Sequence, residues 1–118
     1  MKVTNYRELI AWQKSVDLVV AVYQATKVFP PDEIYGLTSQ VRRAAVSVPS
    51  NISEGQGRGT PNEFIRGLRL AHGSLQESET QLVIAQRLAY LAAREAEGLL
   101  DQTAEVGRII NGLIKSIR

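Results

Sequence analysis

The chain has 118 residues, of which 44% are hydrophobic and 22% are charged, and its formal net charge is +2. This length predicts one domain, residues 1–118, with a continuous core, and the composition is that of an ordinary globular protein. The absence of cysteine excludes disulfides, zinc–thiolate sites and thiol catalysis. Because the sequence has neither an 18-residue apolar run nor a signal peptide, we expect a cytoplasmic protein that does not enter a membrane. Ten of the fourteen basic residues are arginine, which suits bidentate phosphate contact and permits nucleic-acid binding.

The first half of the chain predicts two helices. In residues 6–28, apolar residues recur every three or four positions, which is typical of one face of a helix. The residues expected on that face are Leu9, Trp12, Val16, Val19, Tyr23 and Thr26. Phe29-Pro30-Pro31 ends this helix, because a residue before proline avoids the helical region. After a short turn that begins at Asp32 and Glu33, we expect Thr38 to cap the second helix. Its predicted inner face carries Val41, Ala44, Ala45, Val48 and Ile52.

Residues 49–59 lie between two long helical patterns and contain an unusual number of residues with special backbone properties. Pro49 has no N–H to donate to the carbonyl of Ala45, so we expect it to stop or kink the second helix. Asn51, followed three residues later by Glu54, predicts a capping box that restarts the helix.

Glycines at the end of the same stretch predict a turn. Gly55, Gly57 and Gly59 tolerate positive φ, and Arg58 lies between the last two. Two interpretations stay open: a kinked helix end followed by a flexible connection, or an anion-binding turn in which Arg58 supplies the charge. No Gly-Lys-Ser/Thr follows, which excludes a nucleotide-binding P-loop.

The second half of the chain predicts two further helices. Residues 60–63, Thr-Pro-Asn-Glu, combine a threonine N-cap, a proline at the first helical position and a glutamate three residues after the cap. The seam of the third helix repeats in steps of four and three, through Phe64, Leu68, Ala71, Leu75, Ser78, Leu82, Ala85 and Ala89. The fourth helix carries an apolar stripe of Leu99, Thr103, Val106, Ile110, Leu113 and Ile117, widened by Leu100, Ile109 and Ile114. That stripe is broad for a helix that contacts only its own bundle. Short connections between four amphipathic helices favour an all-α, antiparallel up-down-up-down four-helix bundle.

Chemistry-bearing residues are sparse. A di-iron bundle needs a Glu-x-x-His motif on two helices, whereas His72 is the only histidine and lies three residues after Arg69. Glu77 and Glu79 differ by two positions, so they point to different sides of a helix. We therefore expect no enzyme activity, no metal, no cofactor and no small-molecule substrate. Gly73 lies inside the third helix, where glycine costs about 1 kcal/mol relative to alanine. We expect something to approach its backbone closely: a neighbouring helix of the same subunit, or a second subunit.

The predicted topology separates charge between the two ends of the bundle. At one end, nine basic residues face five acidic ones, a net charge of +4, whereas five basic and seven acidic residues give −2 at the other. The candidate nucleic-acid-binding residues at the positive end are Arg7, Arg58, Arg66, Arg69, Lys115 and Arg118. The more ordinary interpretation of a pair such as Arg66 and Arg69 is a solvated helix face.

Three stretches of the sequence carry a family resemblance. They are Tyr35-Gly36-Leu37-Thr38-Ser39-Gln40-Val41-Arg42-Arg43-Ala44-Ala45, then Ser47-Val48-Pro49-Ser50-Asn51-Ile52-Ser53-Glu54-Gly55 with Arg58, and Gly73-Ser74-Leu75-Gln76-Glu77-Ser78-Glu79-Thr80-Gln81-Leu82. They resemble the four-helix-bundle proteins related to the 23S rRNA intervening-sequence protein, also called the S23 ribosomal protein family, and residues 9–30 resemble the first helix of that family. The resemblance covers nearly the whole chain.

This resemblance implies a bacterial cytoplasmic bundle that assembles as a homopentamer, like the related accessory proteins of diversity-generating retroelements. The function it favours is a non-enzymatic, oligomeric RNA-binding or ribonucleoprotein-accessory protein, with rRNA as a candidate partner. The alternative is an oligomeric adaptor that binds another protein and touches RNA weakly or not at all. A ring that aligns five positive ends on one face would gather +20 there and −10 on the other face.

Overall fold

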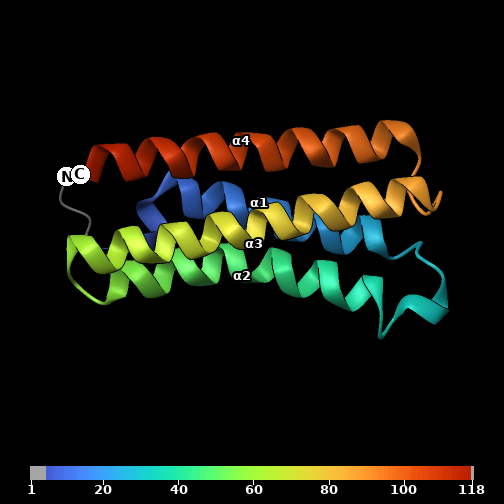
Figure 1. Cartoon of the computed structure of the whole chain (residues 1–118), viewed down its shortest axis with the longest axis horizontal. Coiled ribbons are helices and arrows are strands. Elements are labelled where there is room, and N and C mark those ends of the chain that lie inside the picture. The colour runs from blue at the N-terminus through green and yellow to red at the C-terminus, as the bar shows by residue number, and fades with distance from the viewer. Residues whose placement is uncertain (1–4, 118) are drawn as a thin grey trace.

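The computed structural model describes residues 5–117, and in that part of the chain all regular secondary structure is helical. Its elements are η1 (Tyr6–Glu8), α1 (Ile10–Thr26), η2 (Pro31–Glu33), α2 (Leu37–Gly57), α3 (Pro61–Arg87) and α4 (Ala93–Ile117). The four long helices lie side by side in a body of 44 × 24 × 19 Å (Figure 1). The predicted all-α fold with four helices is confirmed.

Successive helices connect at alternating ends of this body. In Figure 1 the start of α1, the α2–α3 connection and the end of α4 lie at one end, which we call the α2–α3 end. The α1–α2 and α3–α4 connections, residues 27–36 and 88–92, lie at the opposite end, which we call the far end. No helix within residues 5–117 is long and apolar enough to cross a lipid bilayer.

The buried face of α1 differs from the predicted one. The residues it buries are Ala11, Ser15, Leu18, Val22, Ala25 and Thr26. Of the predicted set, Leu9 and Thr26 are buried, whereas Trp12, Val16 and Val19 are half-buried and Tyr23 is exposed. The two patterns have the same spacing and are offset by one residue, so periodicity alone does not separate them. Alanine and serine on the inner face let α1 lie close to its neighbours, and the larger side chains lie along its flanks.

The other three core faces follow the sequence more closely. All five residues predicted for the inner face of α2 are buried. On α3 the predicted seam is buried from Phe64 to Ala85, but Ala89 lies beyond the helix, exposed and with φ 63°. On α4, Leu99, Thr103, Val106 and Ile110 are buried. The remaining residues of its broad stripe pack half-buried against the core. They are Leu100, Ile109, Leu113, Ile114 and Ile117.

The predicted stop of the second helix at Pro49 and its restart at Asn51 are wrong, because α2 continues through Pro49 to Gly57. The other predicted effect of Pro49, a kink, stays a prediction. A proline inside a helix costs about 3 kcal/mol, and the burial of Val48, Pro49 and Ile52 opposes that cost, since most helix stability in proteins comes from packing. Asn51 is therefore not a cap. Its side-chain amide donates to the carbonyl oxygen of Ser47 at 2.8 Å.

The glycines near the end of α2 also act differently from the prediction. Gly55 is helical, and a Cβ on Gly67 of α3 would lie 2.8 Å from its Cα and 2.6 Å from the carbonyl oxygen of Asn51. These two glycines therefore bring the backbones of α2 and α3 into contact. Gly57 is the last residue of α2, and the turn at positive φ is made by Gly59, with φ 88°.

The two predicted helix starts have opposite outcomes. The start of α3 is confirmed: Thr60 Oγ1 accepts a hydrogen bond from the N–H of Glu63 at 3.2 Å, and Pro61 is the first helical residue. The predicted Thr38 cap is wrong, because Thr38 is buried inside α2. The N–H of Leu37 at the start of α2 donates instead to Glu33 Oε1, at 3.0 Å.

Glu33 also joins the two connections at the far end. The hydroxyl of Tyr90, after α3, donates to Glu33 Oε2 at 2.8 Å, and the Tyr90 ring lies 5.4 Å from that of Phe29. Hydrogen bonds from the N–H of Leu37 and from Tyr90 lower the pKa of Glu33. The bond to the Glu33 carboxylate in turn raises the pKa of Tyr90.

Candidate nucleic-acid interface

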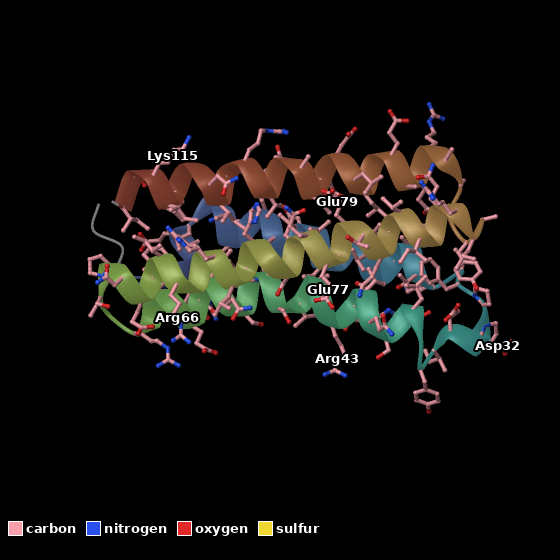
Figure 2. The ribbon with its side chains drawn as sticks, in the orientation of Figure 1. Asp32, Arg43, Arg66, Glu77, Glu79 and Lys115 are labelled. Atoms are coloured by element: carbon pink, nitrogen blue, oxygen red, sulfur yellow. The ribbon has the colours of Figure 1, made fainter. Side chains whose placement is uncertain are left out.

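The cations predicted to bind nucleic acid do not form one cluster. Arg7, Arg58, Arg66, Arg69 and Lys115 are all exposed, and Arg118 lies outside the described residues. In Figure 2 Lys115 projects from the outer side of α4, whereas Arg66 lies on the side of α3 next to α2. Arg7 lies in η1, with its guanidinium 5.9 Å from the centre of the Tyr6 ring. The remaining four described cations divide between two grooves on opposite sides of α3.

The first groove, the α2–α3 groove, has a volume of about 110 Å³. It is lined by Asn51, Glu54, Gly55, Arg58, Glu63, Arg66, Gly67 and Leu70. Each of its arginines has a carboxylate beside it. Arg58 Nη2 lies 3.4 Å from Glu54 Oε1, and Arg66 Nη1 lies 3.8 Å from Glu63 Oε2. The two positive charges in this narrow groove are therefore balanced by two negative ones.

The second groove, the α3–α4 groove, has a volume of about 430 Å³. It is lined by Arg69, His72, Asn111, Ile114 and Lys115. This lining contains two cations and no carboxylate, and within residues 5–117 neither Arg69 nor Lys115 forms an ion pair. Positive charge in the α3–α4 groove is therefore not locally neutralised.

Helix spacing explains how these residues meet. Arg69 and His72 are three positions apart on α3, and Asn111 and Lys115 are four apart on α4, so each pair shares a helix face. Farther along the same helix contact, a Cβ on Gly107 would lie 3.4 Å from a methyl carbon of Leu75. A side chain therefore separates α3 from α4 there, whereas bare backbones meet between α2 and α3.

The charges along α4 are distributed so that its basic residues lie in the half that borders the α3–α4 groove. Its first half carries four acidic residues and one basic residue, and its second half carries Arg108 and Lys115. Acidic groups near a helix N-terminus and basic groups near its C-terminus both complement the helix dipole. The same arrangement gives α4 its positive charge at the α2–α3 end.

Two further observations concern metal-binding side chains and Gly73. Within residues 5–117 no three His, Asp or Glu side chains gather where they could hold a metal ion. Gly73 is exposed, and no atom of the described chain lies within 4 Å of the position its Cβ would take, apart from its own helix and neighbours. The predicted approach of a helix from the same subunit is therefore wrong, and the approach of a second subunit stays a prediction.

The sequence predicts Arg69 and Lys115 as binding residues but does not predict the other residues that line the groove with them. From the sequence, His72 is a lone helix residue, Ile114 belongs only to the apolar stripe of the fourth helix, and Asn111 has no assigned role. The available signal was spacing, since Asn111, Ile114 and Lys115 fall on one helix face, as do Arg69 and His72. What the spacing could not show is that these two faces border the same groove.

Comparisons with known proteins agree on one family. Residues 7–112 match the family model described as 23S rRNA-intervening sequence protein. A crystal structure of a protein of unknown function from the S23 ribosomal protein family of Bacteroides thetaiotaomicron VPI-5482 superimposes with a TM-score of 0.80. The match covers 90% of this chain and 99% of that chain at 21% sequence identity, which shows a shared fold. No curated protein matches the sequence.

Proposed function

Because this chain belongs to the family of 23S rRNA-intervening sequence proteins, we propose that it is a non-enzymatic, oligomeric RNA-binding or ribonucleoprotein-accessory protein of the cytoplasm. The observation that carries the proposal is the α3–α4 groove, where Arg69 and Lys115 lie without a carboxylate in the lining. Cations of this kind neutralise phosphates and release counterions, which supplies much of the affinity of proteins for nucleic acids.

Assembly would multiply this weak local charge. We propose the homopentamer that the family resemblance implies, with the α2–α3 ends of the subunits on one face. A single subunit presents few phosphate contacts, whereas a ring can engage one RNA at several points and gain avidity. The exposed Gly73 and four half-buried apolar residues of α4 that do not line the α3–α4 groove are surfaces that a neighbouring subunit could cover. These four are Leu100, Ile109, Leu113 and Ile117. Light scattering at micromolar concentration tests the proposal, and a mass that stays at 13.0 kDa on concentrating would contradict it.

Charge reversal tests RNA binding. Arg66→Glu with Arg69→Glu should abolish binding of a labelled RNA at low salt, and Arg43→Glu with Arg87→Glu should leave most of it. Arg42 is unsuitable as a control, because its Nε donates to Thr26 Oγ1 at 2.8 Å and its guanidinium lies 4.7 Å from the centre of the Tyr23 ring. Both double variants must first be shown to keep the wild-type mass. Absence of RNA binding by the wild type at low salt would contradict the proposed function.

The alternative function, an oligomeric protein-binding adaptor, has its own observation. Ile10, Val20 and Tyr23 on α1 are 60%, 51% and 40% exposed, and exposed apolar residues that gather into a patch mark protein contacts. An adaptor would bind its partner through apolar contacts that salt weakens little, whereas RNA affinity should fall steeply with salt. Affinity measured between about 50 and 200 mM salt separates the two functions.

A further inference from the structure

We propose that the α3–α4 groove, rather than the α2–α3 groove, is the RNA site, and that it takes single-stranded RNA. In this arrangement Arg69 on α3 and Lys115 on α4 contact backbone phosphates along the groove, and a base or ribose lies against Ile114 and His72. The inference rests on the RNA-binding function proposed above and adds to it the residues of the site and the form of the RNA.

The cations of the α3–α4 groove are not paired with carboxylates, which favours this groove as the RNA site. In the α2–α3 groove a phosphate would have to compete with Glu54 for Arg58 and with Glu63 for Arg66, at the distances given above. It would also be repelled by both carboxylates. In the α3–α4 groove no lining residue is acidic, so a phosphate meets Arg69 and Lys115 without a competing anion. Planar arginine can bind a phosphate through two hydrogen bonds, whereas lysine acts as a point charge.

Size and lining favour the same groove. Its volume of about 430 Å³ lies within the range of about 300–1,000 Å³ that is usual for small-molecule sites, and the 110 Å³ of the α2–α3 groove lies below it. The half-buried Ile114 supplies an apolar contact in the same lining as the cations, and the half-buried His72 supplies an aromatic ring. Asn111 adds an amide that can both donate and accept hydrogen bonds.

This mixture of groups matches a single strand better than a duplex. In an RNA duplex the bases are stacked inside, the major groove is too narrow for side chains, and the accessible surface is phosphate and ribose. In a single strand a base is free to leave its neighbours and stack on an aromatic side chain such as histidine. An apolar and aromatic contact in the same groove as two phosphate-binding cations has a use only when a base or ribose face can reach it.

The decisive comparison uses matched pairs of cations on the same two helices. Arg69→Gln with Lys115→Gln removes one cation from α3 and one from α4 in the groove. Arg87→Gln with Arg94→Gln removes one exposed cation from each of the same helices toward the far end. Fluorescence anisotropy at 50 mM salt would follow a labelled 12-nucleotide single-stranded RNA and a duplex of the same length. Light scattering would confirm that every variant keeps the wild-type mass.

We expect the groove variant to bind the single strand about tenfold or more weakly, with a salt dependence shallower by about 0.7 per lost phosphate contact. The control variant should stay within about twofold of wild type, because its cations lie outside the groove. His72→Ala should weaken binding without changing the salt dependence, since a base contact releases no counterion.

Each contrary result has a separate meaning. If the wild type binds RNA, but Arg58→Gln with Arg66→Gln weakens it more than the groove variant does, the inference fails and the proposed function stands. Equal affinity for duplex and single strand, with no effect of His72→Ala, overturns the single-stranded assignment. Equal displacement of RNA by poly-glutamate makes the groove a general polyanion site and overturns the RNA assignment. No binding of either RNA by the wild type overturns both proposals.

Discussion

The two sides of α3 show how the same kind of residue is put to different uses. On the α2 side, Gly55 and Gly67 bring two helix backbones together, and both nearby arginines are paired with carboxylates. On the α4 side, Leu75 separates the helices near Gly107, and the groove beyond holds cations with no acidic residue in its lining. Exposed ion pairs contribute only about 0–1 kcal/mol, so these pairs add little to the contact between α2 and α3.

This difference teaches that the charge count of an end does not locate a binding site. Arg58 and Arg66 contribute to the positive total of the α2–α3 end as much as Arg69 and Lys115 do. The local field near each pair depends on whether a carboxylate lies beside it. Helix packing sets the width of each groove, because a tight contact between helix backbones leaves a narrow groove and a contact separated by side chains leaves a wider one.

The largest expected effect on stability comes from adding a methyl group at the contact between α2 and α3. The matched control adds a methyl group at the contact between α3 and α4. Gly67→Ala places a Cβ 2.6 Å from the carbonyl oxygen of Asn51, a backbone atom that cannot move alone. We expect it to lower the free energy of unfolding by about 1–3 kcal/mol, as overpacking does. Urea denaturation measures the loss. Gly107→Ala, the matched control, meets only the end of the Leu75 side chain, at 3.4 Å. It should leave the free energy of unfolding unchanged or raise it by up to about 1 kcal/mol, because alanine is the better helix former. Equal losses in the two variants would remove the contrast between the two sides.

A smaller effect should separate the true cap of this region from the one the sequence wrongly predicts. Thr60→Ala removes the hydrogen bond to the N–H of Glu63 and should cost about 1 kcal/mol, as N-cap losses do. Asn51→Ala loses a bond to the Ser47 carbonyl, worth about 1 kcal/mol. It gains most of this back, because alanine is the better helix former by up to about 0.7 kcal/mol. Thermal and urea denaturation of both variants provide the test, and a larger loss for Asn51→Ala than for Thr60→Ala would contradict the continuous α2.

Helix number and most core faces could be predicted because they depend on local signals. The Thr60-Pro61 start of α3 and its seam from Phe64 to Ala85 are fixed by residues close together in the chain. The inner face of α1 could not be predicted this way, because two stripes of equal spacing compete. The choice between Ala11 and Trp12 as the inward residue depends on how closely the other helices approach.

The candidate site was predictable only in part, for a related reason. Basic residues at the α2–α3 end follow from topology, but the pairing of Arg58 with Glu54 depends on the chain remaining helical between them, through Gly55 and Gly57. Glycines at this spacing suggest a turn instead, because they tolerate positive φ. Gly55 is a residue typical of turns, but in the structure it lies within α2 and contacts Gly67 on α3. Local helix spacing therefore decides which cations are paired with a carboxylate, and long-range packing decides which cations border the same groove.

The far end allows stability to be changed without touching either groove. Tyr90→Phe removes the 2.8 Å hydrogen bond to Glu33 and should lower the melting temperature at pH 7 while leaving RNA affinity unchanged. Because the pKa of Glu33 is lowered in the fold, its contribution to stability is present above the ordinary carboxyl pKa of about 4.3 and is lost as pH falls through the folded value. The difference between variant and wild type should therefore shrink at acid pH. A difference that grows on acidification, or a loss of RNA binding at pH 7, would contradict this separation of roles.

The smallest expected change in stability is at Gly73. Its sign tells whether a second subunit packs on this residue. This residue lies on the exposed face of α3 between the two grooves, and no other part of the described chain comes within 4 Å of where its Cβ would be. In an isolated subunit Gly73→Ala should raise the free energy of unfolding by about 0.5 kcal/mol, because alanine has less conformational freedom to lose on folding. If a second subunit packs on this glycine, the added methyl group meets that subunit instead, and the oligomer should dissociate at higher protein concentration than the wild type. Denaturation at several protein concentrations, together with light scattering, distinguishes the two results. A gain in stability with an unchanged mass would show that both grooves lie beside a free helix face and that the subunits meet elsewhere.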